Sequence, residues 1–371
     1  MVPDIRKGGN TMKKVIMFYI NSLNRGGAER VILRLAYHFA DAGFRSVVVT
    51  SFIDSNEYPV PDGVERISIE KEQVLQSRLK KNVSRIYALR RIAKEIKPDV
   101  LISFMCEPNF RAICATAGLG IKRIVSVRND PNKEYAGKLG YLVGKILLPL
   151  ADGCVFQTKD AQAWFPKCLR DKSVVIYNEV DSKFFDIKYT GSKRIVTMGR
   201  LTEQKNHQML IQAFSQIANL FPDWELHIWG VGALESDLRA EICELNLQDR
   251  IILKGLTSDV PSVLKEAGIF VLSSDYEGMP NALMEALAVG VPSVSTDCPC
   301  GGPRMLIKHG ENGMLTPVSD SDSLAHNIKL LIEDEQLARR MSRQATIMAR
   351  AYAPEAVFSE WLRYVEKVIG K

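Results

Sequence analysis

Residues 14–43 read KVIMFYINSLNRGGAERVILRLAYHFADAG, and this stretch contains the unit from which we expect the fold to be built. After Lys14 the next six residues form an apolar run, which predicts a buried strand over Lys14–Ile20. A turn with two adjacent glycines follows, and apolar residues then recur at helical spacing from Ala28 to Gly43. A buried strand, a glycine-containing loop and an amphipathic helix in this order are typical of parallel α/β sheets.

The same alternation continues along the chain in two sets. Further strands are predicted in the first set at Ser46–Phe52, Asp99–Phe104, Arg123–Val127 and Gly153–Gln157. A polar stretch without periodicity, Phe184–Lys193, suits a linker. The second set of predicted strands is Arg194–Met198, Glu225–Trp229, Ile251–Leu253, Ile269–Leu272 and Ser293–Ser295. We therefore predict an α/β protein with two Rossmann-like domains, 1–184 and 185–353, facing each other across a central cleft, and a terminal helix in 354–371.

The composition narrows the class of protein. The chain has 371 residues, of which 46% are apolar and 25% charged, as in ordinary globular proteins. No apolar run reaches the roughly 20 residues that span a bilayer, and the first residues lack the apolar core of a signal peptide. Seven scattered cysteines do not form a disulfide framework, and their spacing does not suit zinc. We expect a cytoplasmic protein without a bound metal.

The first loop with possible chemistry contains Gly26 and Gly27, between the first predicted strand and its helix. Glycines let a backbone approach a ligand closely, and the start of a helix offers free N–H groups to an anion. The alternative is a loop that needs glycine only for a positive φ. A pair of glycines alone is weak evidence, and this is not the dinucleotide pattern GxGxxG.

A second loop follows the first strand of the second set and reads Gly199-Arg200-Leu201-Thr202-Glu203-Gln204-Lys205-Asn206. Arg200 and Lys205 are placed to converge on a diphosphate, with a bidentate contact from arginine and a point charge from lysine. The alternative is a solvated loop with two cations. A third glycine loop, Gly230-Val231-Gly232, is either another close approach to a ligand or merely a tight connection.

Two glutamates lie in and after the loop that follows Ile269–Leu272. Glu277 precedes Gly278 and Pro280, which mark a tight turn, and Asn281 is a candidate N-cap for the next helix. Glu285 lies one turn inside that helix among apolar neighbours. Carboxylates accept hydrogen bonds from vicinal hydroxyls, so sugar and ribose are sensible ligands. The alternative is an exposed helix face beside a loop carboxylate.

In combination these residues resemble the family 4 glycosyltransferases of GT-B fold, of the kind that build bacterial surface polysaccharides. The resemblance is carried by Gly26-Gly27-Ala28-Glu29, by Gly199-Arg200-Leu201 with Lys205-Asn206, by Glu277 and Glu285 spaced as E-x7-E, and by Gly290-Val291-Pro292 and Gly310-Glu311-Asn312-Gly313. It covers nearly the whole chain. No single one of these motifs is specific, but their combination is.

The resemblance implies an acceptor-side domain first, a nucleotide-sugar domain second, and a terminal helix that returns to the first domain. It implies that Arg200 and Lys205 hold the donor diphosphate, that Glu277 faces the transferred sugar and that Glu285 binds the ribose. The other donor-binding positions that it implies are Gly26, Gly27, Gly199, Gly278, Met279, Asn281 and Ala282. It implies no cofactor, only a nucleotide sugar as substrate.

One position departs from the family pattern. Many relatives have a histidine after the strand that corresponds to Arg123–Val127, whereas this chain has Arg128-Asn129-Asp130. A guanidinium does not act as a general base at ordinary pH. The departure fits a retaining mechanism in which the leaving phosphate helps to deprotonate the acceptor. Arg128 is then a candidate for donor or acceptor contact, with a structural salt bridge as the alternative.

The segment from Arg78 to Lys97 combines helical apolar periodicity with eight lysines and arginines against Glu95 alone. A solvated helix face is one explanation, but the lack of acids favours an anionic partner. We predict a membrane-binding patch made of Lys80, Lys81, Arg85, Arg90, Arg91 and Lys94. No nucleic-acid-reading motif accompanies it, so nucleic acid is not the expected partner.

The resulting hypothesis is a retaining enzyme that moves a hexose or N-acetylhexosamine from a nucleoside diphosphate sugar, UDP-linked by preference, to a lipid-linked or polysaccharide-precursor acceptor. It would form an α-glycosidic bond at the inner face of the cell membrane. The alternatives are a nucleotide-sugar epimerase and a non-catalytic sugar-nucleotide-binding protein of the same fold.

Overall fold

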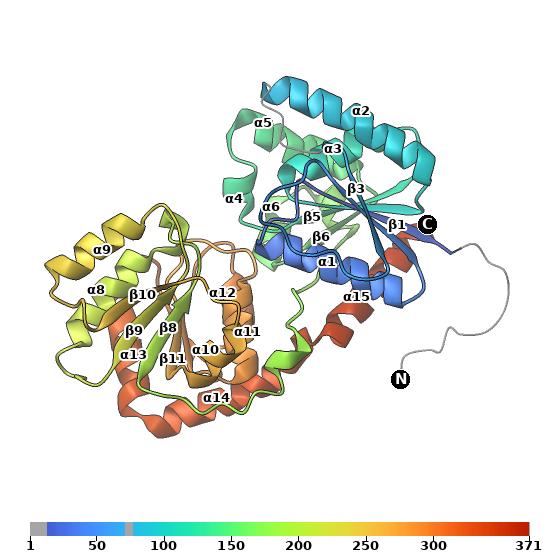
Figure 1. Cartoon of the computed structure of the whole chain (residues 1–371). Helices are drawn as coiled ribbons and strands as arrows, with labels where there is room; N and C mark the ends of the chain where they lie inside the picture. Colours follow the sequence, from blue (N-terminus) through green and yellow to red (C-terminus); the bar gives the residue numbers. More distant parts are fainter. Residues whose placement is uncertain (1–12, 71–76, 371) are drawn as a thin grey trace.

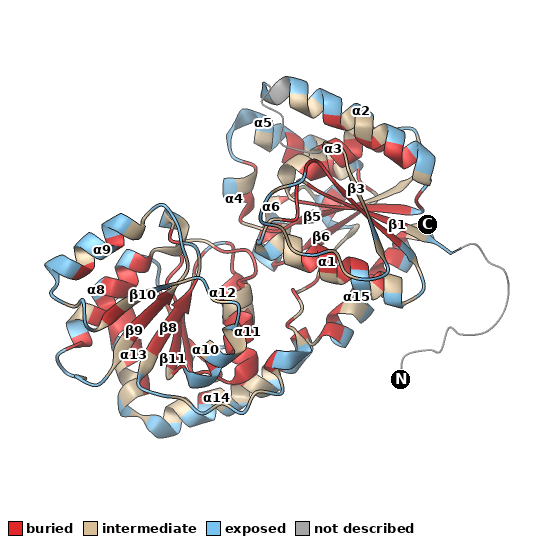
Figure 2. Cartoon of the chain, viewed as in Figure 1, coloured by how far each residue is buried: buried red, intermediate tan, exposed pale blue. Residues whose placement is uncertain are grey.

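Two parallel β-sheets, each with helices on both faces, form two domains that lie side by side in the computed structural model (Figure 1). The structure describes residues 13–70 and 77–370, apart from the side chains of Arg78 and Leu79. Buried residues are concentrated in the strands and on the inner faces of the helices in both domains (Figure 2). The predicted α/β architecture with two Rossmann-like domains is confirmed.

The first domain is built on a seven-stranded sheet with the order β3-β2-β1-β4-β5-β6-β7. Its strands are β1 (Val15–Ile20), β2 (Arg45–Thr50), β3 (Val64–Ser68), β4 (Val100–Phe104), β5 (Lys122–Val127), β6 (Gly153–Phe156) and β7 (Ser173–Val175). Its helices are α1 (Gly27–Asp41), α2 (Arg78–Ile96), α3 (Cys106–Thr116), α4 (Pro131–Glu134), α5 (Gly137–Leu142), η1 (Val143–Leu147), η2 (Leu148–Leu150), α6 (Lys159–Trp164) and α7 (Lys167–Arg170). The turn η3 (Ser182–Phe184) lies in the connection to the second domain.

The second domain is built on a six-stranded sheet with the order β10-β9-β8-β11-β12-β13. Its strands are β8 (Arg194–Met198), β9 (Glu225–Trp229), β10 (Ile251–Gly255), β11 (Ile269–Leu272), β12 (Ser293–Thr296) and β13 (Met314–Thr316). Its helices are η4 (Glu203–Lys205), α8 (His207–Ile217), α9 (Glu235–Glu244), α10 (Val260–Glu266), α11 (Asn281–Val289), α12 (Gly302–Leu306), α13 (Ser321–Glu333), α14 (Glu335–Ala349) and η5 (Arg350–Tyr352).

Three strands, β3, β7 and β13, were not predicted from the sequence, and all three lie at the edge of a sheet. β3 has polar side chains at three of its five positions and is only half-buried, while β7 and β13 have three residues each. Edge strands pair on one side only and need no continuous apolar run, so the apolar signal that reveals the central strands is absent from them.

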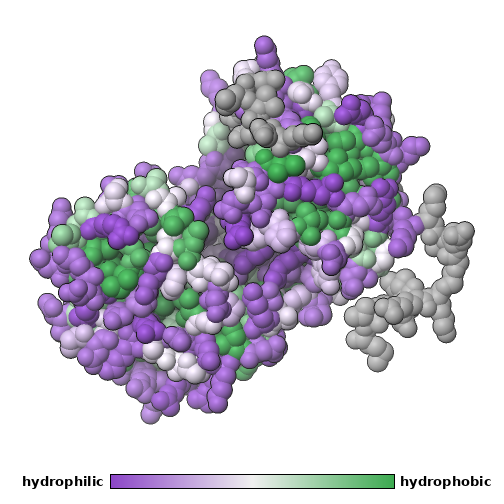
Figure 3. All heavy atoms as spheres, viewed as in Figure 1, coloured by the Kyte–Doolittle hydropathy of each residue, from purple (hydrophilic) through white to green (hydrophobic). Residues whose placement is uncertain are grey.

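In each sheet the strand order reverses beside the first strand of the domain, between β1 and β4 and between β8 and β11. The loops that follow these strands diverge at such a point and leave a crevice at the carboxyl edge of the sheet. The loops with Gly26, Arg200 and Glu277 follow β1, β8 and β11 respectively. The topology therefore brings the predicted site residues to the two facing edges. Hydrophilic side chains are prominent where the two domains meet (Figure 3).

The last helix, α15 (Pro354–Ile369), leaves the second domain and packs into the core of the first (Figure 1). Trp361 is 1% exposed and stacks on Phe104 of β4 with ring centroids 6.1 Å apart. The Tyr364 hydroxyl accepts a hydrogen bond from the Cys154 N–H at 2.8 Å. The chain thus passes between the domains twice, once in each direction.

Helix α2 corrects part of the predicted membrane patch. Arg85 is buried and pairs with Glu70 at 2.8 Å, and Arg90 donates to the carbonyl oxygens of Ala115 and Ala117. Val83, one of the apolar residues at helical spacing in this segment, is 46% exposed. Arg85 lies inward because its long stem is buried and its charge is neutralised by the glutamate.

Candidate active site

Hydrogen bonds join the loops after β8 and β11, among them one from the Gln204 amide to the Tyr276 carbonyl at 2.9 Å. The Asp275 N–H donates to the Gln204 carbonyl at 2.9 Å, and the Asn206 amide donates to the Asp275 carboxylate at 2.7 Å. The Ser273 hydroxyl donates to the Lys205 carbonyl at 2.9 Å. β8 and β11 are neighbours in the sheet, so their loops emerge side by side. The cationic loop and the glutamate loop therefore form one rigid unit.

Within this unit Lys205 Nζ lies 2.5 Å from Glu277 Oε1. The Ser274 hydroxyl donates to the same carboxylate oxygen at 2.8 Å. The side chains of Lys205 and Glu277 are 17% and 9% exposed, so the pair is largely removed from water. The structure brings together the cation predicted to hold a diphosphate and the carboxylate predicted to face a sugar.

Arg200 is exposed, and no hydrogen bond or ion pair of its side chain occurs within the residues that the structure describes. Its charge acts on Glu29 of the first domain. Burial raises the pKa of Glu29, and Arg200 partly opposes that rise. An exposed guanidinium in the same loop as Lys205 suits the binding of an anion.

Glu285 lies one turn inside α11 and is 6% exposed, which removes the alternative of an exposed helix face. Its Oε1 accepts from Arg30 Nη2 at 2.5 Å. Arg30 belongs to α1 of the first domain, so the two domains are joined by an ion pair at this carboxylate.

The glycine loop at the start of α1 is a place of close approach. Gly26 has φ −119°, which any residue adopts, so a positive φ does not explain it. A Cβ on Gly27 would lie 3.0 Å from Nδ2 of Asn281 in the second domain. Gly230, by contrast, has φ +145°, and a Cβ there would lie 1.9 Å from the Gly199 carbonyl. That loop is a tight connection between neighbouring backbones.

Asn281 is not an N-cap, because it is the first residue of α11 and Pro280 takes the cap position. Its side-chain oxygen instead accepts from Asn178 Nδ2 at 2.6 Å. Asn178 also donates to the Met279 carbonyl at 3.3 Å. A Cβ on Gly278 would lie 2.4 Å from the Arg128 carbonyl. Three of the predicted donor positions, Gly278, Met279 and Asn281, are thus in direct contact with the first domain.

Arg128 is buried, and its guanidinium donates to the side-chain oxygen of Asn178 and lies 4.5 Å from the centre of the Phe104 ring. Burial lowers the pKa of Arg128 to about 9, although the nearby Glu134 raises it. The side chain therefore supports the loop that carries Met279 and Asn281 through Asn178, instead of forming the salt bridge that was the alternative. Its role toward a substrate stays a prediction.

Glu134 is a further buried carboxyl at this edge that the sequence did not reveal. Burial raises its pKa to about 7, while the N–H groups of Cys106, Arg128 and Asn129 favour the anion. The Cys106 N–H donates to Oε1 at 2.7 Å. This carboxyl connects the start of α3 with the loop after β5.

Three functional contacts were missed: Arg30, Asn178 and Ser274. Arg30 directly follows the Gly-Gly-Ala-Glu motif, and its position on one face of α1 was a signal that the motif extends one residue further. Nothing local distinguishes Asn178 or Ser274 from other loop residues. In residues 13–70 and 77–370 there is no group of three or more His, Cys, Asp or Glu that is arranged to hold a metal ion.

Two protein-family models match the chain. The model Glycosyltransferase Family 4 matches residues 25–184, and Glycosyl transferases group 1 matches residues 180–348. Two relatives from Campylobacter jejuni are similar over almost their whole length. The N-acetylgalactosamine-N,N'-diacetylbacillosaminyl-diphospho-undecaprenol 4-alpha-N-acetylgalactosaminyltransferase is 27% identical, with 95% of this chain and 100% of that protein aligned. The GalNAc-alpha-(1->4)-GalNAc-alpha-(1->3)-diNAcBac-PP-undecaprenol alpha-1,4-N-acetyl-D-galactosaminyltransferase is 25% identical, with 95% and 98% aligned.

Among solved structures, HepE from Anabaena in complex with UDP and glucose has a TM-score of 0.81. It is 18% identical, and the match covers 95% of this chain and 99% of that one. The two facing Rossmann-like domains thus define the GT-B class of transferases. The chain belongs to the family 4 glycosyltransferases.

Proposed function

We propose that the protein is a retaining transferase that moves a hexose or N-acetylhexosamine from a UDP-sugar to a lipid-linked or polysaccharide-precursor acceptor, forming an α-glycosidic bond. The observation that carries this proposal is the Lys205–Glu277 pair at the domain junction, where the helix that follows Glu277 carries the buried Glu285 and its first residue, Asn281, lies against Gly27. Two cations match the diphosphate of a nucleotide sugar, and two carboxylates match the hydroxyls of its ribose and of its sugar.

Each part of the cluster has a proposed role. Arg200 and Lys205 bind the diphosphate and stabilise the charge that grows on it as it leaves. Glu285 accepts the ribose hydroxyls, and Glu277 accepts hydroxyls of the transferred sugar. The backbone of Gly27 and the start of α11 close over the phosphates. The cations take the place that a metal ion has in other transferases.

The chemical step conserves atoms without a cofactor. The bond between the anomeric carbon and the β-phosphate oxygen breaks, and the acceptor oxygen bonds to that carbon on the same face. The acceptor proton passes to the departing phosphate, so no general base is required. Arg128 does not have to replace the histidine of other relatives, since its contacts to Asn178 and Phe104 give it a supporting task.

The nature of donor and acceptor rests on the relatives. Both Campylobacter jejuni proteins are named as α-N-acetylgalactosaminyltransferases that act on undecaprenol-linked sugars, and HepE binds UDP and glucose. A lipid-linked acceptor of this type would bring the enzyme to a membrane. No helix in the described part of the chain is long and apolar enough to cross one.

We propose peripheral binding to an anionic bilayer through one face of the first domain. Of the predicted patch on α2, Lys80, Arg91 and Lys94 are exposed and Lys81 is half-buried. Helix α3 packs against both α2 and η1, so the segment 137–150 lies on the same face of the sheet. That segment has five exposed apolar side chains, between 45% and 70% exposed: Leu139, Tyr141, Leu142, Ile146 and Leu150.

Residues 136–150 contain two lysines and no acid. Exposed apolar side chains beside cations are the pattern of surfaces that enter the headgroup region of anionic membranes. Each cation near such a surface contributes about 1 kcal/mol. Together they describe a bilayer contact in which the cations attract and the apolar residues insert.

The catalytic proposal is tested first by a thermal-shift screen of UDP-, GDP- and ADP-sugars on the purified protein. The sugar that stabilises it is then incubated with membrane lipid extract, and the products are identified by mass spectrometry and anomeric NMR. We expect an α-linked product from the wild type, and loss of at least ~100-fold in rate for Glu277→Ala. The exposed Glu244→Ala is the control. Conversion of the donor without any acceptor would show an epimerase instead, and binding without turnover a non-catalytic protein.

The membrane proposal is tested by co-sedimentation with vesicles of neutral or anionic lipid. We expect Ile146→Ser and Leu139→Ser to weaken binding to anionic vesicles, while Leu220→Ser, which is 59% exposed in the second domain, does not. Equal binding by all three variants would contradict the proposed surface.

A further inference from the structure

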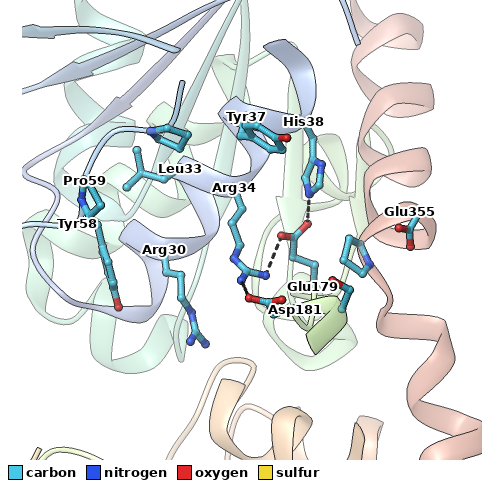
Figure 4. A pocket seen from close by; sticks show the side chains of 13 residues that line it. Arg30, Leu33, Arg34, Tyr37, His38, Tyr58, Pro59, Glu179, Asp181 and Glu355 are labelled. Carbon is cyan, nitrogen blue, oxygen red and sulfur yellow. Dashed lines mark hydrogen bonds and ion pairs between the residues drawn. The ribbon is translucent and has the colours of Figure 1, made fainter. Parts of the chain in front are cut away.

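Helix α1 carries a row of basic side chains at intervals of one turn, Arg30, Arg34 and His38. Figure 4 shows them on one side of the helix, facing the second domain, the connection between the domains and α15. They line a pocket of about 530 Å³ together with Tyr58 and Glu179. Each of the three side chains is therefore placed to contact either the connection between the domains or the second domain.

Arg34 and His38 attach α1 to the connection between the domains. Arg34 pairs with Glu179 at 3.3 Å and with Asp181, and His38 Nε2 lies 2.9 Å from Glu179 Oε2 (Figure 4). These contacts determine where α1 lies relative to the segment that joins β7 to β8. They make no contact with the predicted donor residues.

Arg30 differs because its guanidinium points out of this row toward the second domain (Figure 4). Nη2 lies 2.5 Å from Oε1 of Glu285, and the two side chains are 32% and 8% exposed. Burial lowers the pKa of Arg30, but Glu285, Tyr58 and Asp181 together outweigh that effect, and the pKa is raised above its usual value. Within the described residues no hydrogen bond reaches the second oxygen, Oε2.

We propose that Arg30 is a positioning residue of the donor site, which holds the Glu285 carboxylate through Oε1 and leaves Oε2 for the ribose hydroxyls. This inference rests on the proposed function, in which Glu285 binds ribose. A carboxylate with one oxygen engaged by a guanidinium is oriented before the ligand arrives, so less conformational freedom is lost on binding.

The position of Arg30 also links two parts of the site. It lies three residues after Gly27 on the same helix, and Gly27 lies against Asn281 of the second domain. Helix α1 therefore holds the guanidinium at Glu285 and the glycine loop beside the start of α11 at the same time. The rival interpretation is that Arg30 competes with ribose for Glu285 and must leave before a nucleotide binds.

The experiment compares the Kd of UDP with that of 2′-deoxy-UDP by calorimetry. If the wild type prefers GDP or ADP, the corresponding ribo and 2′-deoxy pair is used. We expect Arg30→Met to weaken UDP by about 10-fold, as for loss of support to a charge-assisted hydrogen bond, and 2′-deoxy-UDP by less than about 2-fold. Arg30→Lys retains a cation and should recover part of the loss. In a Glu285→Gln background, Arg30→Met should raise the Kd of UDP by less than a further factor of about 2.

Arg45→Met is the matched control, because Arg45 forms an exposed pair with Glu65 at 2.8 Å far from the cleft. Melting temperatures of all variants separate misfolding from altered binding. Tighter UDP binding by Arg30→Met would overturn the inference in favour of competition, and equal weakening of both nucleotides would overturn it in favour of a purely structural role. A wild type that binds no nucleotide at all would overturn the proposed function itself, and the inference with it.

Discussion

Replacing Lys205 by methionine should destabilise the second domain, because Glu277 would keep its charge without a cation. Glu277 is 9% exposed, and its Oε1 would retain only the Ser274 hydroxyl at 2.8 Å. Removing one partner of a buried ion pair costs about 3–5 kcal/mol. The Lys205 side chain is 17% exposed, so water reaches the site, and we expect a loss of about 2–3 kcal/mol in the free energy of unfolding. Methionine keeps the contact that the lysine stem makes with Gly199.

Differential scanning calorimetry measures this effect as a fall in the melting temperature. For a domain of this size about 1 kcal/mol corresponds to about 2–4 °C, so we expect a fall of about 4–12 °C. Adding Glu277→Gln removes the buried charge and should recover most of the loss. Lys193→Met is the control, because its pair with Asp223 has a length of 2.7 Å but both side chains are more than half exposed. If the two lysine variants melted alike, or if Glu277→Gln failed to restore stability, burial of the pair would not be the cause.

Three further changes test other parts of the structure. The pKa of Glu134 is raised to about 7, so its protonated form favours folding below about pH 4.5, and that contribution is lost as the pH rises to 7. Glu134→Gln should therefore be about 1–3 kcal/mol more stable than the wild type at pH 8 but not at pH 5. A difference in urea unfolding that does not depend on pH would contradict this assignment. Trp361→Ala removes a buried ring stacked on Phe104 and should lower the free energy of unfolding by about 3–5 kcal/mol, measured as a lower melting temperature of the first domain. A loss below about 1 kcal/mol would show that α15 is not part of that core. Gly278→Ala places a methyl group 2.4 Å from the Arg128 carbonyl. We expect this overlap to push the domains apart and to raise the radius of gyration in X-ray scattering. An unchanged radius with full activity would show that the two loops adjust to the methyl group.

The central part of the fold was predictable because buried parallel strands are recognisable as apolar runs. β1, β4 and β11 are surrounded by side chains on both faces, and the sequence shows this directly. The edge strands β3 and β7 were not predictable, since three of the five residues of β3 are polar without a period and β7 is too short for a pattern. The placement of Arg85 on α2 was wrong because it depends on a contact that the sequence does not show. Charge alone placed Arg85 outside, whereas Glu70 compensates it inside.

The candidate site was predictable as far as it depends on position after a strand. Lys205 and Glu277 follow neighbouring strands, and the structure brings them into contact. Contacts between the domains were beyond the sequence, because Arg30 and Glu285 are 255 residues apart and meet only when both sheets are placed. The contacts of Asn178 could not be predicted for the same reason, because its four hydrogen-bond partners come from both domains.

The return of α15 to the first domain has a consequence for the order in which the protein is made. A ribosome completes the seven strands of the first sheet long before it reaches Trp361 and Tyr364, which belong to the core beneath that sheet. The first domain to be synthesised is therefore the last to be finished, and it exposes the apolar surface around Phe104 while the second domain is being built. A chain that ends before α15 would therefore leave unfinished the core of the domain that was made first.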